Sequence, residues 1–391
     1  MTEPQNGSDR HASWLELFFD LVVVVAVNQL AHLLHGDEHH GPGGLAITTF
    51  FALYLAIWLV WTTFTLYSNV VADRVRQRAM FFGMAGIATM AATVPHGMGE
   101  RSNVFAAAYL ITSGLGAASF TESGQILLSW GAASRNAGLV PWLVSFWVHH
   151  PWWKLGLWLL GLAMTLWFSV LSNRVDGAEL IARYNAQLAR RRRRKPANLV
   201  AATVDPAHLG ERLGLFVIIV LGEAMLQLVG AAAQIEDWTP GSGHGWLLLL
   251  TVAAGFGLLI TLWWLNVRHG FAEATRFSPT VVLPAHFAAI AAITTIAAGL
   301  GTATTASATH LPAASAWLLC SGAAAYLLVI TAITPQHHRV VLSVCAIAVP
   351  LIAAALAPLL PGAVIVATLL VACTAQAWNL RNLRHRQEMG A

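Results

Sequence analysis

Charged residues are scarce in this sequence. Asp, Glu, Lys and Arg make up 10% of its 391 residues, whereas 57% are hydrophobic and the mean hydropathy is +0.63. Soluble domains have about 25% charged residues, so this chain has too few to cover a water-facing surface. The composition excludes a soluble globular protein and indicates an integral membrane protein. The 16 Trp residues suit anchors at the membrane interface.

The sequence also lacks the motifs of several functional classes. The three cysteines, Cys320, Cys345 and Cys373, all lie in apolar runs, which argues against a disulfide framework. Met1–His11 is short and polar, so we expect no cleavable signal before the first span. There is no phosphate-binding glycine loop, nucleophile elbow or zinc helix. The histidines of the Gly-rich segment 35–40 lack a fixed scaffold. We therefore predict no catalytic residue, cofactor or metal.

Apolar runs of about 20 residues, the length that crosses a bilayer as a helix, recur along the chain. They predict an all-α protein of about twelve transmembrane helices. The weakest is the fifth, which is short and could be re-entrant. The predicted spans are Trp14–Leu34, Leu45–Asn69, Ala79–Pro95, Asn103–Leu128, Asn136–Val148, Lys154–Leu171, Pro206–Gly230, Trp246–Asn266, Thr280–Leu300, Ala313–Ile333, Val340–Ala357 and Gly362–Leu380.

The basic residues predict the orientation of these spans. With both termini in the cytoplasm, 20 of the 22 Lys and Arg residues fall on the inner side, and only Arg101 and Lys154 fall outside. Connections on the cytoplasmic side carry this excess in membrane proteins. The outer connections instead carry acidic residues: Asp37, Glu38, Glu100, Glu236 and Asp237.

A polar linker predicts the division of the chain. Residues 174–205 separate a first membrane half, 1–173, from a second, 206–391. The run Arg190–Lys195 in this linker follows a membrane span, so we expect it to contact anionic lipid headgroups rather than nucleic acid.

The two halves begin alike, which predicts an internal repeat. Glu16-Leu17-Phe18-Phe19-Asp20-Leu21 opens one half and Glu211-Arg212-Leu213-Gly214-Leu215-Phe216 opens the other. Twelve residues after each Glu lies a deep polar residue, Asn28 in one half and Glu223 in the other. Six spans per half, each starting from the cytoplasm, would make two parallel repeats. The second span of each half also ends in an aromatic-x-Asn sequence, at Asn69 and Asn266.

Two carboxylates lie early in the first span. Glu16 follows Ser13 by three residues, the spacing of a capping box, so it has either a capping role or a buried polar role. Asp20 is one turn further on the same face, about 10 Å from the helix start. That depth is too great for capping and favours an interior polar role.

The seventh span begins with a capping signal and then carries ionisable residues. Asp205-Pro206 reads as an N-cap followed by proline at the first helical position. Glu211 and Arg212 lie in the second turn, and His208 is positioned to pair with Glu211. A structural ion pair and a functional site are both open interpretations.

Glu223 is the strongest single candidate. It lies about 25 Å from the start of its helix, inside an apolar run, with Gln227 one turn later. No cap or snorkelling route explains a carboxyl group there. It is either a hydrogen-bonded structural residue or a site for a proton, a cation or a substrate.

Four further residues are secondary candidates: Asn69, Glu122, His208 and Asn266. Glu122, with Gln125, lies near the end of the fourth span. His286, a candidate coupling residue, is a lone imidazole in the ninth span and is either a hydrogen-bonded core residue or a ligand. Asn69 and Asn266 end their helices and are also explained as C-terminal caps.

Two of these stretches resemble the signatures of one family. Leu15-Glu16-Leu17-Phe18-Phe19-Asp20-Leu21-Val22 resembles the opening signature of the bacterial low-temperature requirement A proteins, and the run from His208 to Glu223 resembles their second. His286 matches a histidine of a later span. One departure is Tyr109-Leu110-Ile111-Thr112-Ser113, where the family tends to place an arginine after the tyrosine. The resemblance implies a multi-pass membrane protein named for a cold-growth phenotype, with no established reaction or substrate.

We therefore expect a bacterial inner-membrane protein that acts as a proton- or ion-coupled secondary transporter of a small molecule or ion. In this hypothesis Asp20, Glu211 and Glu223 form the coupling site, and Asn28 and His286 assist. One alternative is an intramembrane enzyme that uses these carboxylates on a lipid or isoprenoid-like substrate. Another is a non-catalytic membrane or stress protein whose buried polar groups specify packing.

Overall fold

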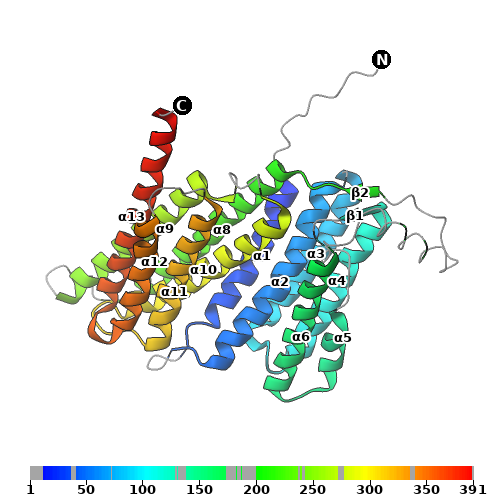
Figure 1. Cartoon of the computed structure of the whole chain (residues 1–391). Helices are drawn as coiled ribbons and strands as arrows, with labels where there is room; N and C mark the ends of the chain where they lie inside the picture. Colours follow the sequence, from blue (N-terminus) through cyan, green and yellow to red (C-terminus); the bar gives the residue numbers. More distant parts are fainter. Residues whose placement is uncertain are drawn as a thin grey trace. The chain divides into compact units, whose positions relative to one another are not determined.

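Almost all of the chain whose structure can be described is helical (Figure 1). The all-α class is therefore confirmed, apart from one short pair of strands. The basic run 190–195 and the acidic residues 37–38 lie outside the described residues. The computed structural model describes residues 12–36, 41–71, 73–127, 130, 138–172, 182, 186, 200–236, 238–239, 243–271, 277–334 and 340–389.

The elements form two series along the chain. Up to Ser172 they are α1 (Trp14–His32), α2 (Gly44–Val70), α3 (Asp73–Thr93), η1 (Val94–His96), α4 (Ser102–Ser123), β1 (Gln125–Leu127), α5 (Leu139–Val144), η3 (Ser145–Trp147) and α6 (Pro151–Ser172). From Val200 they are β2 (Val200–Ala202), α8 (Pro206–Ala233), α9 (Gly243–His269), α10 (Pro279–Thr305), α11 (Ala313–Ile333), α12 (Val340–Ala355), η5 (Ala357–Leu359) and α13 (Gly362–Met389).

Within the described residues, nine helices are long and apolar enough to cross a membrane. A helix satisfies its own backbone hydrogen bonds, which is what a segment in hydrocarbon requires. These nine agree with predicted spans to within a few residues at most ends, and α11 has both predicted bounds. Of the remaining predicted spans, α6 has 22 residues and α12 has 16.

The fifth predicted span, Asn136–Val148, is not a full-length helix. Helix α5 has six residues, about 9 Å, and continues only into the short η3. Gly138, just before α5, lies against Gly161 in the middle of α6: a Cβ atom on Gly161 would be 2.6 Å from the Gly138 carbonyl oxygen. The α5–η3 segment therefore accompanies only the first half of α6.

The fourth predicted span, Asn103–Leu128, ends too late. Helix α4 stops at Ser123 because Gly124 adopts the left-handed conformation, with φ +70°. The next residues form β1, which pairs in parallel with β2, from Gln125 opposite Val200 to Leu127 opposite Ala202. The twelve-span scheme places the end of the fourth span and the linker on the same side of the membrane, and the pairing is consistent with that.

The chain divides into two compact units by its contacts. Unit 1 comprises Met1–Ala26, Ala52–Arg212 and Thr275–Leu283, and unit 2 comprises Val27–Phe51, Leu213–Ala274 and Pro284–Ala391. Each unit draws residues from both sides of the linker, so this division differs from the predicted halves 1–173 and 206–391. Those halves and their repeat relationship stay predictions.

Aromatic stacking holds α4, α5 and α6 together in unit 1. The rings of Trp142 and Trp158 stack with centroids 4.7 Å apart and planes 10° apart, and Tyr109 lies 4.3 Å from Trp142. The Trp158 indole N–H donates to the Ser145 hydroxyl at 2.9 Å. Buried aromatic pairs of this kind contribute about 0.5–1.5 kcal/mol beyond the area that they bury.

Close helix approach characterises unit 2. A Cβ atom on Gly299 of α10 would lie 2.5 Å from the Cβ atom of Leu319, and one on Gly322 of α11 would lie 2.3 Å from the Thr295 hydroxyl oxygen. Small residues at such interfaces let membrane helices approach closely. They keep α10 largely buried and hold its C-terminal half, which contributes to the site described below, in place.

Gly161→Ala tests the close approach in unit 1. A methyl group there meets backbone and the Trp142 ring, so we expect a loss of about 1–3 kcal/mol in the free energy of unfolding. Gly156→Ala on the same helix is the control, because its Cβ atom would meet nothing within 4 Å. Unfolding of the full chain in detergent measures both. Equal effects of the two substitutions would contradict the packing described here.

Candidate functional site

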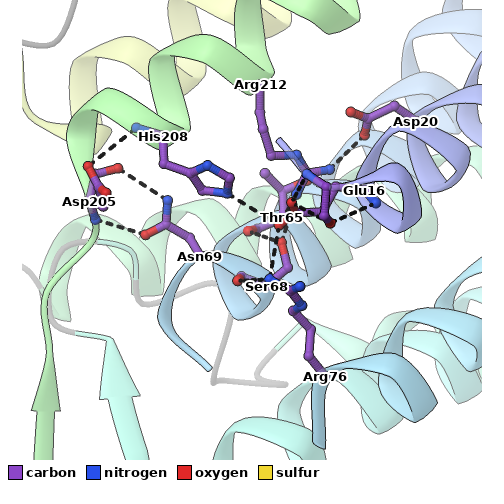
Figure 2. A network of polar contacts seen from close by, with 10 residues as sticks. Glu16, Asp20, Thr65, Ser68, Asn69, Arg76, Asp205, His208 and Arg212 are labelled. Atoms are coloured by element: carbon purple, nitrogen blue, oxygen red, sulfur yellow. Dashed lines mark hydrogen bonds and ion pairs between the residues drawn. The ribbon is translucent and has the colours of Figure 1, made fainter. Parts of the chain in front are cut away.

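Five ionisable side chains meet within unit 1 (Figure 2). They come from the start of α1, the start of α3 and the first two turns of α8, and the end of α2 supplies neutral partners. We call this group the ionic cluster. Its members are Glu16, Asp20, Arg76, His208 and Arg212, and all five are buried.

The first turn of α8 is held by an N-cap and by a pair of hydrogen bonds between the Asn69 side chain and the Asp205 backbone, which we call the Asn69 clip. The Asp205 carboxylate accepts hydrogen bonds from the backbone N–H groups of Ala207 at 3.0 Å and His208 at 3.3 Å, which confirms the predicted N-cap. The Asn69 side chain, at the end of α2, bonds both the N–H and the C=O of Asp205, at 2.8 and 3.1 Å. These bonds orient His208 and Arg212 toward α1 (Figure 2).

Glu16 has two roles at once. Its Oε2 atom accepts from the backbone N–H and the hydroxyl of Ser13, both at 2.8 Å, which confirms the capping box. Its Oε1 atom lies 3.3 Å from Nε2 of His208 and 3.6 Å from Nη1 of Arg76. The structure places His208 against Glu16, on a different helix from its predicted partner Glu211.

Arg212 and Asp20 form the central ion pair. Nη2 of Arg212 donates to Oδ1 of Asp20 at 2.8 Å, and the Trp61 indole N–H donates to the same oxygen at 2.7 Å. Nη1 of Arg212 donates to the Ser68 hydroxyl at 2.7 Å and lies 3.8 Å from Oε1 of Glu16. Asp20 is therefore an interior polar residue, as its depth predicted.

The ionic cluster is balanced in charge. Two carboxylates face two guanidinium groups, so the net charge is zero when His208 is neutral. Arg212 is 1% exposed and Asp20 is fully buried, so breaking this pair leaves an uncompensated charge away from water. Chemically, the arrangement can hold two anions and two cations in fixed positions.

Sequence reasoning missed three residues of this site. In the sequence, Arg76 is one of several positive charges on the predicted inner side. The alternation of Arg74, Arg76 and Arg78 does not show which of these side chains turns toward the protein interior. Trp61 and Ser68 lie in an apolar helix without a distinguishing pattern. The stretch that begins at Tyr109 lacks the arginine that the family tends to place there. The cations that pair with Glu16 and Asp20 are instead Arg76 and Arg212.

A second carboxylate lies in unit 2. The side-chain amides of Asn28 on α1 and Gln227 on α8 both donate to Oε1 of Glu223, the latter at 2.9 Å. We call these three residues the amide–carboxylate group. Glu223 is 7% exposed, and in the described part of the chain it forms no ion pair with Lys or Arg. It differs in this respect from Glu16 and Asp20.

A pocket of about 780 Å³ adjoins the amide–carboxylate group. Asn28 and Gln227 line it, together with side chains from the C-terminal parts of α1, α8 and α10 and from the segment before α11. The volume lies in the range of about 300–1,000 Å³ that is usual for small-molecule sites. The pocket, with Glu223 behind two of its lining residues, is large enough for a small solute.

The remaining candidates lie elsewhere. His286 is buried in unit 2 between the rings of Phe216 and Phe271, with centroids at 5.5 and 5.2 Å. Asn266 donates to the Gly214 carbonyl at 3.1 Å and so joins α9 to α8. Glu211 is half-buried on α8.

Glu122 is exposed in the last turn of α4, and Gln125 belongs to β1. Gln125 therefore lies beyond the fourth helix, in which the predicted span had placed it, because Gly124 ends that helix. Among the described residues, no group of three or more His, Cys, Asp or Glu side chains is arranged to hold a metal ion.

Comparison with known proteins gives the family. The sequence model for the bacterial low temperature requirement A protein (LtrA) matches residues 11–377. The chain belongs to this family. The earlier resemblance is thereby confirmed, and membership of a bacterial membrane family together with the apolar helices suggests an inner-membrane protein. The stretches that carry the resemblance supply Glu16 and Asp20 from α1, and His208, Arg212 and Glu223 from α8.

One curated relative is an uncharacterized protein of Rhizobium meliloti (strain 1021). It is 27% identical to this LtrA-family chain over 284 residues, which cover 68% of the chain and 60% of the relative. The chain thus spans less than two thirds of that relative's length. No solved structure matches the chain significantly.

A double-mutant cycle tests the central ion pair. Arg212→Gln leaves Asp20 and Glu16 with one cation fewer, and we expect it to lower the free energy of unfolding by about 3–5 kcal/mol. Asp20→Asn in the same chain restores the charge balance and should recover part of the loss. Chemical unfolding in detergent measures the four forms.

The exposed Arg78 supplies the control for this cycle. Arg78→Gln should change the free energy of unfolding by less than about 0.5 kcal/mol, as surface substitutions usually do. Additive losses in the double variant, with a coupling below about 0.5 kcal/mol, would contradict the ion pair.

Proposed function

We propose that this LtrA-family protein is an ion-coupled secondary transporter of a small solute, with Glu223 at its binding site. The observation that carries the proposal is the pocket of about 780 Å³ lined by Asn28 and Gln227, both of which donate to Glu223. A carboxyl group in a transmembrane segment is costly and marks a solute or ion path in many membrane proteins. Here it adjoins a space that a solute can fill.

The surroundings of Glu223 support an exchangeable charge. Two neutral amides, those of Asn28 and Gln227, donate to one of its oxygens. In the described structure no fixed cation neutralises it permanently. A proton or a solute cation can therefore bind and leave. Glu16 and Asp20, held by guanidinium groups, lack this freedom.

The predicted orientation places the pocket on the outer side. Its lining comes from the ends of α1, α8 and α10, which the charge distribution assigns to the extracellular face. A solute from outside would reach Asn28 and Gln227 first.

We assign the ionic cluster a positioning role in this function. Its balanced charges and the Asn69 clip fix the first turns of α8. This assignment differs from the sequence-based hypothesis, in which Asp20, Glu211 and Glu223 share one coupling site. In the present proposal the buried charges of unit 1 specify packing, and of these three carboxylates Glu223 alone binds the solute.

The pocket lining favours transport over lipid chemistry. An enzyme acting on an isoprenoid-like substrate requires an apolar tunnel open to the bilayer. The lining instead includes imidazole, amide and hydroxyl side chains, among them His32, Gln234 and Thr302. Such groups suit a solute that arrives from water.

Reconstituted vesicles that contain a pH-sensitive dye test the proposal. Under an imposed pH gradient, amines, amino acids, sugars and carboxylic acids are added in turn. We expect at least one class to change the internal pH with the wild-type protein. The response should be lost in Glu223→Gln, which has nearly the same size but cannot bind and release a proton.

Glu236→Gln is the matched control, because Glu236 is an exposed carboxylate just beyond α8. Its response should equal that of the wild-type protein. An unchanged response in Glu223→Gln would overturn the assignment of Glu223, and no response to any class would contradict transport of these solutes. Melting temperatures of all forms exclude loss of folding as the cause.

A further inference from the structure

We propose that the pocket binds a protonated amine, an organic ammonium ion that carries at least one N–H group. The ammonium nitrogen would lie against Asn28, Gln227 and Thr302. This inference rests on the proposed function for its biological meaning, since it names the class of solute. Its evidence, however, is the chemistry of the pocket alone.

The first argument is the orientation of two amides. Asn28 and Gln227 each direct their side-chain NH2 group at the Glu223 carboxylate. An ionised carboxylate only accepts hydrogen bonds, so it fixes which end of each amide faces it. The amide oxygens are therefore the ends of the two groups that do not bond Glu223, and both residues line the pocket. We assign these two oxygens to the ammonium group as acceptors, with the negative charge of Glu223 behind them.

The second argument is the direction of the helices. The C-terminal parts of α1, α8 and α10 all contribute to the pocket lining, through residues such as His32, Ala231 and Thr305. Each helix C-terminus carries about half a negative charge from its aligned peptide dipoles. One helix start, that of α11 at Pro312, also reaches the lining. Three negative ends against one positive end favour a cation.

The third argument concerns hydroxyl groups on α10. Thr302 donates to the Ala298 carbonyl at 3.3 Å, and Thr305 donates to the Thr302 carbonyl at 3.0 Å. Because each hydroxyl proton is donated to a backbone carbonyl of the same helix, each hydroxyl oxygen can act toward the pocket only as a hydrogen-bond acceptor. Both residues line it. An N–H donor on the solute would match these oxygens.

His35, one of the histidines that line the pocket, does not oppose a cation. His35 lies against Gly301, where an added Cβ atom would be 3.2 Å from its Nε2. Burial, together with the neighbouring His32, lowers the pKa of His35 below its ordinary value. It is therefore neutral at pH 7. Nδ1 of His310 lies 3.2 Å from the Leu360 carbonyl oxygen and donates to it. The described lining contains no Lys or Arg.

The size of the pocket excludes a bare ion as its natural occupant. A volume of about 780 Å³ suits a molecule of several carbon atoms, and apolar lining such as Leu226 can contact its hydrocarbon part. The negative charge of Glu223, behind Asn28 and Gln227, would complement the charge of the ammonium group.

Binding to the full chain in detergent tests this inference. The probes are primary ammonium ions from butylammonium to phenylethylammonium, each with the alcohol and the carboxylate of matched shape, and tetramethylammonium. Stabilisation of the folded protein against heating reports binding at each concentration. We expect the ammonium ions to bind at least about tenfold more tightly than the alcohols, as one charge-assisted hydrogen bond provides. Tetramethylammonium, which has no N–H group, should bind more weakly than the primary ions.

Two variants locate the site. Glu223→Gln should weaken binding of the primary ammonium ions by at least about tenfold. Thr302→Val, which keeps the shape and removes one acceptor, should weaken it less, and it remains informative if the first variant does not fold. Thr374→Val is the control, because Thr374 is an exposed residue of α13 whose hydroxyl also donates within its helix. Its affinity for the probes should equal that of the wild-type protein.

The outcomes separate this inference from transport itself. Equal or tighter binding of alcohols or carboxylates, or no binding of any ammonium ion, overturns the inference. Transport of sugars or acids without ammonium binding would leave the proposed function standing and overturn the solute class. Ammonium binding without any movement across vesicles would support the pocket chemistry and contradict the transporter.

Discussion

The permanent charge of Arg212 is the constraint on which the rest of unit 1 depends. A guanidinium group keeps its proton under all conditions met in proteins, and this one is 1% exposed. Its charge must therefore be compensated by carboxylates, and the nearby carboxylates are those of Asp20 and Glu16 on α1. Ser68 and Trp61 of α2 complete the hydrogen bonds. Three helices are thus held at one end by the need to compensate a single buried cation.

The same residue type has different uses in the two units. In unit 1 the carboxylates meet guanidinium groups, and these ion pairs are part of the packing. In unit 2 Glu223 meets only the neutral amides of Asn28 and Gln227 among the partners described. An amide stabilises a negative charge without cancelling it. In the proposed function, this difference in partner, rather than depth alone, separates the structural carboxylates from the one assigned to solute binding.

Much of this fold follows from composition and periodicity. A run of apolar residues predicts a membrane helix because only internal hydrogen bonding satisfies its backbone in hydrocarbon, and α11 shows how closely such a run gives the bounds. The capping residues Ser13 and Asp205 were also readable, because each signal lies within one turn. The half-length α5 and the β1–β2 pair were not, since both depend on contacts distant in sequence, such as Gly138 with Gly161. Residues Glu16, Asp20 and Glu223 were identifiable as charges in apolar surroundings, but their partners Arg76 and Trp61 required the three-dimensional arrangement.

The ionic cluster has a consequence for biosynthesis. Its members on α1 and α8 are 192 residues apart, so Asp20 leaves the ribosome long before Arg212. At about 5–20 residues per second, the interval is about 10–40 s. During that time the nascent chain must place Glu16 and Asp20 in or near the bilayer without their principal counterion. Arg76, which is translated much earlier, is the one cation of the finished cluster that can shield them while the later helices are made.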